Sequence, residues 1–293
     1  MYNSLISSNI KLSEWVENVQ HPDLDKEPQT LNFLERIIYL SHRITLFGKK
    51  YSPYSLMFNV GLLSVLGTVW FLSVKFHLDI NIFAGINYIL IFHYPGYPLY
   101  LWVKSRLFNI QGRSYIQDCI FFLIPGYTFC CWLMGQSVLV SLDLLGILLP
   151  LIAGIVRVGC FLSGCCHGKF SAKFGVLYTP SYLLPEHRDT KLAAAFYTGY
   201  PVFPIQLVEA SFNLTLFVIL LVRLLLTEEF TGQTLSLYFL VYCIYRFFAD
   251  FYRESSIRPK IGKFSEAQCI SMVLILVCTL TLQGEQILEL LKF

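Results

Sequence analysis

The stretch VRVGCFLSGCCHGK, residues 156–169, follows a long apolar segment and concentrates side chains that can do chemistry. It holds one arginine, three cysteines and a histidine: Arg157, Cys160, Cys165, Cys166 and His167. Such residues can bind a metal ion, exchange electrons or hold an anion, and each use makes a different demand on spacing. The stretch therefore predicts a site with one of these three chemistries.

The spacing of the cysteines argues against the metal and redox interpretations. Structural zinc sites usually combine two pairs of ligands, each pair spaced by about two to four residues. Cys165 and Cys166 are adjacent, and the other cysteines, Cys130 and Cys131 included, are scattered through apolar segments and offer no convincing partner. C-x-x-C, the spacing of thiol–disulfide motifs, is absent from the sequence. We therefore predict no metal ligand and no cofactor, and interpret Cys160, Ser163 and Gly164 as small residues that allow close packing.

A second arginine favours the anion-binding interpretation. Arg246 precedes Asp250 by one helical turn in another apolar segment, so the two side chains share a helical face. Ionisable groups at membrane depth cost roughly 2.5–3.5 kcal/mol on insertion scales and are candidates for function. Arg157 and Arg246 lie toward the same side of the membrane and are predicted to converge on one phosphate. The alternatives are snorkelling of either arginine to the interface, or neutralisation of Arg246 by Asp250.

The segments that carry these residues are apolar enough to span a bilayer. Hydrophobic residues make up 55% of the 293 residues and charged residues 14%, and a span needs about 20 mostly apolar residues. Lipid offers no hydrogen bonds to the backbone, so long spans must be helices. We predict an all-α polytopic membrane protein with about seven transmembrane helices, at 57–76, 82–102, 117–133, 138–163, 205–226, 234–251 and 267–282.

The remaining segments differ in composition. Residues 1–50 are polar and then amphipathic, and their apolar stripe suits either a helix on the membrane surface or a helix packed on the protein body. Residues 51–284 form the predicted transmembrane domain, and residues 285–293 form a tail. The loop after the fourth span, 167–204, mixes prolines, charges and aromatics and is predicted to form a small extramembrane cap. We expect no nucleic-acid partner.

These motifs resemble those of the prolipoprotein diacylglyceryl transferases, a bacterial family of integral membrane enzymes with seven transmembrane helices. The family signature Gly-Arg-x-Gly-Asn-Phe-x-Asn-x-Glu-x-x-Gly is similar to VRVGCFLSGCCHG, which keeps four positions in register: Arg157, Gly159, Phe161 and Gly168. Some members carry a Gly-Cys-Phe…Gly-Cys-Cys-x-Gly-Lys form, which matches 159–169 closely. Further similar stretches follow in order over about residues 46–284: YSLMFNVGLL from Tyr54, PIQLVEA with Gln206 and Glu209, and a helix end on which Arg246 and Asp250 match Arg-x-x-x-Glu.

The resemblance implies a multi-pass enzyme of the bacterial inner membrane. It would move a diacylglyceryl group from phosphatidylglycerol to the acceptor thiol of a prolipoprotein, with glycerol phosphate leaving. The resemblance places Arg157 and Arg246 on the phosphate, and we add His167 as a third catalytic residue. We expect substrate-binding residues at Tyr54, Gly159, Gly164, Gln206, Glu209 and Asp250.

The sequence departs from the family pattern at several positions. Cys160, Ser163 and Cys165 stand where the signature has Asn, Asn and Glu. The third span also lacks the histidine of the family's His-Gly-Gly motif, and His93 or His167 could take its place.

The distribution of basic residues also differs from the family arrangement. Most Lys and Arg lie on the side of the membrane that holds the N-terminus, and the positive-inside rule places that side in the cytoplasm, opposite to the family arrangement. The alternative is that this face binds anionic lipids, because such a face also gathers basic residues.

Other functions therefore remain open. The same fold could use a different acceptor, such as a glycan, a polyprenyl phosphate or a small thiol. A non-catalytic phospholipid-binding relative is a third possibility. A transporter is the least favoured, because no paired half-repeats or broken helices stand out in the sequence.

Overall fold

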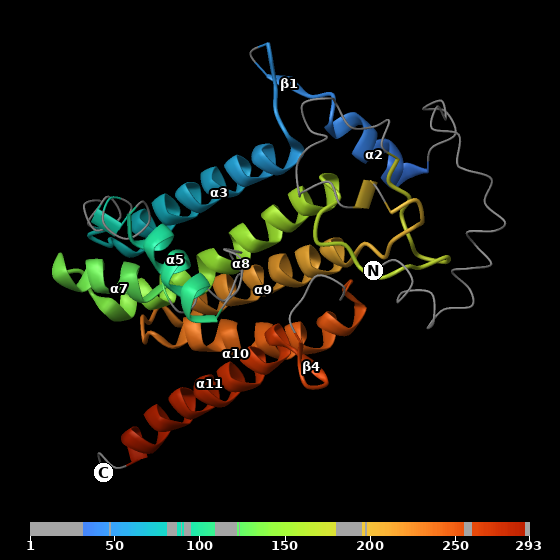
Figure 1. Cartoon of the computed structure of the whole chain (residues 1–293). Coiled ribbons are helices and arrows are strands. Elements are labelled where there is room, and N and C mark those ends of the chain that lie inside the picture. The colour runs from blue at the N-terminus through green and yellow to red at the C-terminus, as the bar shows by residue number, and fades with distance from the viewer. Residues whose placement is uncertain are drawn as a thin grey trace. The chain divides into compact units, whose positions relative to one another are not determined.

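The computed structural model describes residues 32–46, 48–80, 95–108, 124–179, 198–254 and 260–290, together with 87–88, 90, 122 and 195–196. Figure 1 shows the labelled elements, most of which are helices. In chain order they are α2 Phe33–Ser41, β1 Thr45–Leu46, β2 Lys49–Lys50, α3 Pro53–Phe76, α5 Tyr97–Phe108, α7 Ile124–Leu133, α8 Val138–Leu162, α9 Ile205–Thr227, α10 Gln233–Ala249, the 3-10 helix η9 Asp250–Tyr252, β3 Lys260–Ile261, β4 Phe264–Ser265 and α11 Glu266–Leu290.

Five helical segments of the described chain are long and apolar enough to cross a membrane: Pro53–Phe76, Val138–Leu162, Ile205–Thr227, Gln233–Tyr252 and Glu266–Gly284. They coincide with the first, fourth, fifth, sixth and seventh predicted spans, which confirms a helical multi-pass membrane protein. The other two predicted spans lie partly outside the described residues. In their described parts, α5 begins only at Tyr97 and α7 has 10 residues, so the total of seven stays a prediction.

The chain folds into two compact units. The first comprises Met1–Ser64, Leu151–Leu214 and Phe251–Arg258, and the second comprises Val65–Pro150, Thr215–Asp250 and Pro259–Phe293. The helices α3, α8 and α9 each contribute one end to each unit, because the unit boundaries fall inside them. The domain boundaries expected from the sequence stay a prediction.

Small residues allow the helices of the first unit to pack closely. A Cβ atom at Gly159 of α8 would lie 2.9 Å from Cβ of Met57 and 3.3 Å from Cα of Tyr54, both on α3. On α9, Leu214 is equally close, since a Cβ at Gly154 would lie 2.7 Å from its Cγ. Glycines at these two positions therefore bring α3 and α9 against α8, as small residues do in membrane bundles.

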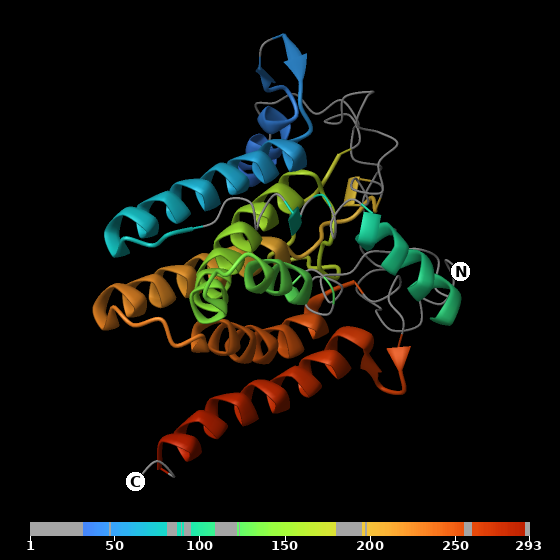
Figure 2. The same ribbon diagram turned by 90° about the vertical axis from the view of Figure 1, so that its left-hand side faces the viewer.

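Helix α2 packs on the first unit through one face only. Its start has a complete capping box between Asn32 and Glu35, and its Ile38 is fully buried in an apolar cluster. Just after the helix, the Nε2 atom of His42 lies 3.0 Å from the carbonyl oxygen of Leu162. The helix thus packs on the protein body, as one of the two alternatives predicted, while a second face keeps apolar side chains exposed at Phe33, Ile37 and Leu40. Figure 2 shows the β1–β2 hairpin that joins α2 to α3.

The described part of the loop 167–204 is well packed. Isolated bridges join Val202 to Phe170 and to Val176. Tyr178 and Phe196 are buried beside Val202 in the same apolar cluster as Ile38. Residues 180–194, which include much of the predicted cap, lie outside the described residues, so the cap itself stays a prediction.

In the second unit, α10 and α11 lie side by side, as Figures 1 and 2 both show. Helix α11 begins with a capping box. The Gln268 amide N–H donates to Ser265 Oγ at 3.2 Å, and the Ser265 amide N–H donates to Gln268 Oε1 at 3.0 Å. This cap fixes where α11 starts, directly after the β3–β4 hairpin.

The start of α10 is capped by a carboxylate from another helix. Asp143 of α8 is fully buried, and its two oxygens accept hydrogen bonds from the amides of Gly232 at 2.7 Å and Thr234 at 2.8 Å. A negative group at a helix N-terminus satisfies unpaired amides and complements the helix dipole. Asp143 therefore has a structural function in joining α8 to α10.

Candidate active site

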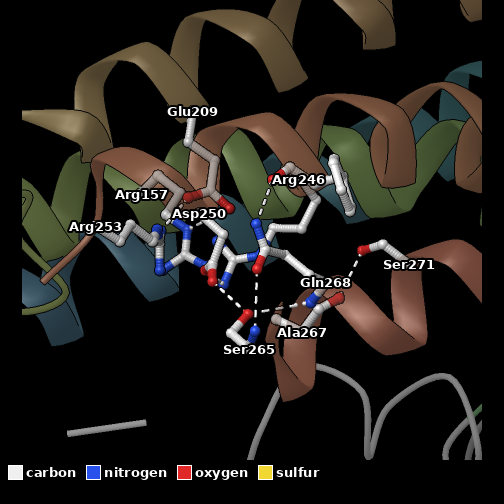
Figure 3. A network of polar contacts seen from close by, with 10 residues as sticks. Arg157, Glu209, Arg246, Asp250, Arg253, Ser265, Ala267, Gln268 and Ser271 are labelled. Atoms are coloured by element: carbon white, nitrogen blue, oxygen red, sulfur yellow. Dashed lines mark hydrogen bonds and ion pairs between the residues drawn. The ribbon is translucent and has the colours of Figure 1, made fainter. Parts of the chain in front are cut away.

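The centre of the site is a buried carboxylate between two guanidinium groups, all within the first unit. Glu209 of α9 accepts from Arg157 of α8, with Oε1 3.1 Å from Nε, and its Oε2 accepts from Nη2 of Arg253. Figure 3 shows the Glu209 carboxylate lying against both arginines. The side chains of Glu209 and Arg253 are 1% and 3% exposed, whereas that of Arg157 is 14% exposed. Arg157 is thus the member of the cluster most open to a ligand.

The cluster contains more positive than negative formal charge. Two guanidiniums share a single carboxylate, so the cluster of Arg157, Glu209 and Arg253 carries a net charge of plus one. Buried charges must be paired and hydrogen-bonded to be tolerated, and Glu209 meets that requirement for both arginines. A guanidinium has five N–H donors, so Arg157 can bind Glu209 and a phosphate oxygen together.

The cysteine loop begins with a Schellman motif at the end of α8. The Cys165 amide donates to the carbonyl of Cys160 at 3.0 Å, and the Gly164 amide donates to the carbonyl of Phe161 at 3.2 Å. Gly164 has a φ of 70°, and a Cβ there would lie 2.8 Å from the Phe196 ring. Only glycine meets both demands. The motif places Cys165 directly beside Cys160, one turn back along the helix.

Cys166 completes a cluster of three thiols. Its φ of 55° is unusual for a residue other than glycine, and the three Sγ atoms of Cys160, Cys165 and Cys166 all lie within 4.8 Å of one another. Cys160 and Cys165 are buried and Cys166 is exposed. The Nη1 atom of Arg157 lies 3.8 Å from Cys160 Sγ. Residues interpreted from the sequence as separate small packing groups are therefore gathered at the edge of the arginine cluster.

The surroundings of the loop shift the pKa values of two of these thiols in opposite directions. Hydrogen bonds from Cys160 and Cys165, and then the Arg157 and Arg253 guanidiniums, hold the pKa of the Cys166 thiol well below its usual range. The pKa of Cys165 is raised, because its thiol hydrogen-bonds to the two neighbouring sulfurs and is buried. Cys166 is thus the thiol most ready to become a thiolate.

Gln206 fixes the cysteine loop to the start of α9. The fully buried Gln206 side chain donates from Nε2 to the carbonyl of Cys165 at 2.7 Å. Backbone bonds extend the attachment, since the amides of Gly168 and Lys169 each donate at 2.9 Å, to the carbonyls of Phe203 and Tyr252 respectively. Gln206 therefore lies at the site, where it holds the loop.

His167 is buried within this attachment. Its Nδ1 lies 2.9 Å from the carbonyl oxygen of Gly168, and its own carbonyl accepts from the Glu254 amide at 3.4 Å. The position is close in the chain to the thiols, and its catalytic function stays a prediction. His93, the other histidine considered as a base, lies outside the described residues.

Tyr54 also belongs to the site. It lies in the first turn of α3, where α3 packs on Gly159, and its phenol interacts electrostatically with Arg157 and with all three thiols. Gly159 and Gly164 are both close to protein atoms, at α3 and at Phe196 respectively. Their part in substrate binding stays a prediction, while their packing function is clear.

The other predicted arginine lies in the second unit. Arg246 Nη2 is 3.3 Å from Asp250 Oδ1, so the ion pair that was weighed as the alternative to phosphate binding by Arg246 is present. Asp250 Oδ2 also accepts from the Ser265 hydroxyl, which links the pair to the cap of α11 (Figure 3). Arg157 and Arg246 belong to different units, and the phosphate clamp that they were predicted to share stays a prediction.

One member of the cluster was not predicted from the sequence. Arg253 was not among the expected site residues, yet its side chain is among the most buried of the site. Glu209 was expected to bind substrate, and the structure shows that it is the carboxylate partner of Arg157, for which only snorkelling was weighed as the alternative. A signal was available: Arg253 directly follows the apolar segment of Arg246 and Asp250.

The fold and the site together define a helical multi-pass membrane protein with a buried Arg–Glu–Arg cluster beside a cysteine-rich loop. The sequence profile described as "Prolipoprotein diacylglyceryl transferase" matches residues 54–283, and the chain belongs to this family. The resemblance seen in the sequence is thereby confirmed.

Individual relatives carry the same family name. The chain is 30% identical over 174 residues to "Phosphatidylglycerol--prolipoprotein diacylglyceryl transferase 2" of Clostridium perfringens (strain 13 / Type A), which covers 59% of this chain and 62% of that protein. It is 27% identical over 234 residues to the phosphatidylglycerol--prolipoprotein diacylglyceryl transferase of Campylobacter jejuni (strain RM1221), with 72% and 79% covered. The similarity to the Clostridium perfringens protein thus spans less than two thirds of that relative.

Proposed function

We propose that this protein transfers the diacylglyceryl group of phosphatidylglycerol to the thiol of an acceptor cysteine in a prolipoprotein, in the inner membrane of a bacterium. Membership of the family and the names of the relatives support both substrates. The observation that carries the proposal is the buried cluster of Arg157, Glu209 and Arg253, because it offers guanidinium donors and a net positive charge to a phosphate in an apolar setting.

In the proposed reaction, the acceptor sulfur attacks the glycerol carbon that carries the phosphate. A C–S bond forms, the C–O bond to the phosphate breaks, and glycerol phosphate leaves with the electron pair. Arg157 and Arg246 are the proposed catalytic residues, because fixed N–H donors stabilise the charge that develops on the leaving phosphate. The acceptor thiol must also lose its proton, and His167 is a candidate to receive it.

The remaining residues are proposed to bind the substrate or to position the catalytic side chains. Glu209 orients Arg157 and offsets the charge of its buried arginine partners. Asp250 does the same for Arg246, and Gln206 holds the cysteine loop. Tyr54, Gly159 and Gly164 are proposed to shape the substrate pocket, with Tyr54 beside the thiols.

The proposal is tested with purified protein, labelled phosphatidylglycerol and a peptide that carries a prolipoprotein acceptor cysteine. Arg157→Gln is expected to lose roughly 100-fold or more in transfer rate, by analogy with the removal of a single transition-state donor. Arg223→Gln is the matched control, because Arg223 contacts Thr234 in the second unit and should retain activity. Absence of transfer by the unmodified protein, or full activity of Arg157→Gln, would refute the proposal.

A different acceptor is a second candidate. It is favoured by the replacement of three signature residues by Cys160, Ser163 and Cys165, and by the third span without a histidine. Expression in a transferase-depleted bacterium distinguishes the two. Restored growth supports the prolipoprotein, whereas failure together with a new diacylglyceryl product in the lipid extract supports another acceptor.

A further inference from the structure

We infer that the thiols of Cys160, Cys165 and Cys166 form a binding site for Zn²⁺ with an open fourth position, which binds the acceptor thiol during transfer. The metal site itself rests on the geometry of the three sulfurs. Its use in catalysis rests on the proposed function.

The sulfur positions suit one thiophilic ion. All three Sγ atoms lie within 4.8 Å of one another. Zn–S bonds of about 2.3 Å in a tetrahedral site require the sulfurs to be about 3.8 Å apart. Side-chain rotations that bring the sulfurs together by about 1 Å therefore complete the site, and the backbone need not change.

The backbone explains why the sequence pattern concealed this site. Zinc sites are usually recognised from paired cysteines with short spacers, whereas here the Schellman motif brings Cys165 next to Cys160 and the left-handed conformation of Cys166 adds the third sulfur. Gln206 holds the carbonyl of Cys165 from the neighbouring helix. The prediction of no metal ligand rested on spacing alone, and the structure supplies the proximity that spacing did not reveal.

Packing alone does not account for this cluster. Cys166 is exposed, so its thiol fills no core space, and its φ of 55° is one that glycine or asparagine adopts more readily. Metal ligands often occupy such positions, because coordination by the ion compensates local strain. The exposure of Cys166 also gives an ion and a fourth ligand access to the site.

The charge of the surroundings favours a divalent ion. Three thiolates and Zn²⁺ carry one net negative charge, whereas three thiolates and a monovalent ion carry two. The guanidinium of Arg157 lies 3.8 Å from Cys160 Sγ, and Arg253 also acts on Cys166. These two neighbours lower the electrostatic cost of a single negative charge, and both also bind Glu209.

Three protein ligands leave one tetrahedral position for substrate, as in catalytic zinc sites. A thiol that coordinates the ion loses its proton, which passes to water. The bound thiolate then forms the C–S bond to the glycerol carbon, the C–O bond to phosphate breaks, and its electron pair leaves with glycerol phosphate. The site would thus activate the acceptor in a chain whose third span has no histidine.

Metal binding is tested on the full chain in detergent, reduced and freed of metal with a chelator. Cd²⁺ replaces Zn²⁺ as a probe, because cadmium–thiolate charge transfer absorbs in the ultraviolet. We expect one Cd²⁺ per chain, which also displaces Zn²⁺ loaded beforehand because thiolates prefer the softer ion, and loss of the absorption in the triple variant Cys160→Ser, Cys165→Ser, Cys166→Ser. The matched control replaces three cysteines of α10 and α11 by serine, at Cys243, Cys269 and Cys278, and should keep the signal.

A single variant covers the case in which the triple variant does not fold. Cys166 is exposed, so Cys166→Ser should fold and should weaken Cd²⁺ binding by at least about tenfold. No thiolate signal in the folded protein, or a signal that survives Cys166→Ser unchanged, would overturn the metal site. A disulfide among the three thiols that persists under reduction would also overturn it.

The transfer assay separates this inference from the proposed function. Removal of the metal should lower transfer, and Zn²⁺ should restore it in the unmodified chain. Full transfer by the metal-free protein would overturn the catalytic use of the site and leave the proposed function standing. A normal Cd²⁺ signal without any transfer would leave the metal site standing and refute the proposed function.

Discussion

Glu209 lies with its Oε1 atom 3.1 Å from Nε of Arg157, and both belong to helices that are far apart in the sequence. The same carboxylate also holds Arg253 through its second oxygen. A carboxylate that is 1% exposed thus fixes two arginines in the interior of the first unit. This contact determines where the guanidinium of Arg157 points, and it is the feature on which the proposed lipid site depends.

Replacing Glu209 tests the energetic importance of this contact. Glu209→Ala leaves two buried guanidiniums without their carboxylate, and breaking a buried ion pair costs about 3–5 kcal/mol. We expect a large fall in the denaturation temperature of the detergent-solubilised protein. The control is Glu228→Ala, because the Lys75–Glu228 pair is largely exposed and such pairs contribute about 0–1 kcal/mol. Equal stability of the two variants would mean that the buried cluster does not form.

Substitutions at two glycines of the first unit distinguish the cost of backbone strain from the cost of side-chain crowding. Gly164 and Gly199 have nearly equal φ values, 70° and 69°, but a Cβ at Gly164 would lie 2.8 Å from Phe196 and one at Gly199 would meet nothing within 4 Å. Gly199→Ala should cost about 1–2 kcal/mol for the left-handed backbone. Gly164→Ala should cost more, because the aromatic ring must also move. Thermal denaturation measures both, and a smaller effect at Gly164 would show that the loop is packed differently.

Asp143 provides a test of the second unit. Asp143→Ala removes the acceptor for two amides at the start of α10, and loss of an N-cap typically costs about 1–2 kcal/mol. Asp143→Asn keeps an acceptor oxygen and should be milder. Asp79→Ala, at an exposed position, serves as the control. Hydrogen exchange at the start of α10 should rise in Asp143→Ala alone, and unchanged exchange would contradict the proposed cap.

Tyr178 gives the protein a predictable weakness at high pH. Its hydroxyl donates to the carbonyl of Phe161 at 2.8 Å, and burial raises the pKa of Tyr178 well above its usual value. When the pKa of a group is higher in the folded than in the unfolded state, the group stabilises the folded state fully at pH values below its unfolded pKa, which is about 10 for tyrosine. This contribution to the free energy of unfolding is lost as the pH rises above that value. Tyr178→Phe should cost about 1 kcal/mol at pH 7.

The same variant should lose less stability than the unmodified protein above about pH 10, since it has no buried hydroxyl to ionise at that position. Urea denaturation at several pH values measures the difference. Parallel pH profiles for the two proteins would show that Tyr178 is not buried in the folded chain.

Hydropathy alone was sufficient to locate five spans, because the length of a membrane helix is set by the bilayer and appears as an unbroken apolar run. The ion pair of Arg246 with Asp250 could also be inferred from the local sequence, since one helical turn separates them, and it was weighed as the alternative to phosphate binding. The five spans and this ion pair are both found in the structure.

The arginine cluster and the thiol cluster could not be predicted from the local sequence. Glu209 meets Arg157 only because two helices pack closely at a glycine, and no local pattern encodes that contact. The thiols meet because a helix ends in a Schellman motif and the next residue turns left-handed. A rule based on cysteine spacing therefore gave no sign that the three sulfurs lie together.

The most direct test of the central claim is an experimental structure of the protein with bound phosphatidylglycerol. We expect the lipid phosphate to lie within hydrogen-bonding distance, about 3 Å, of the guanidiniums of both Arg157 and Arg246. A phosphate bound elsewhere, or either guanidinium directed away from it into the acyl chains, would contradict the claim that these two arginines hold the donor lipid.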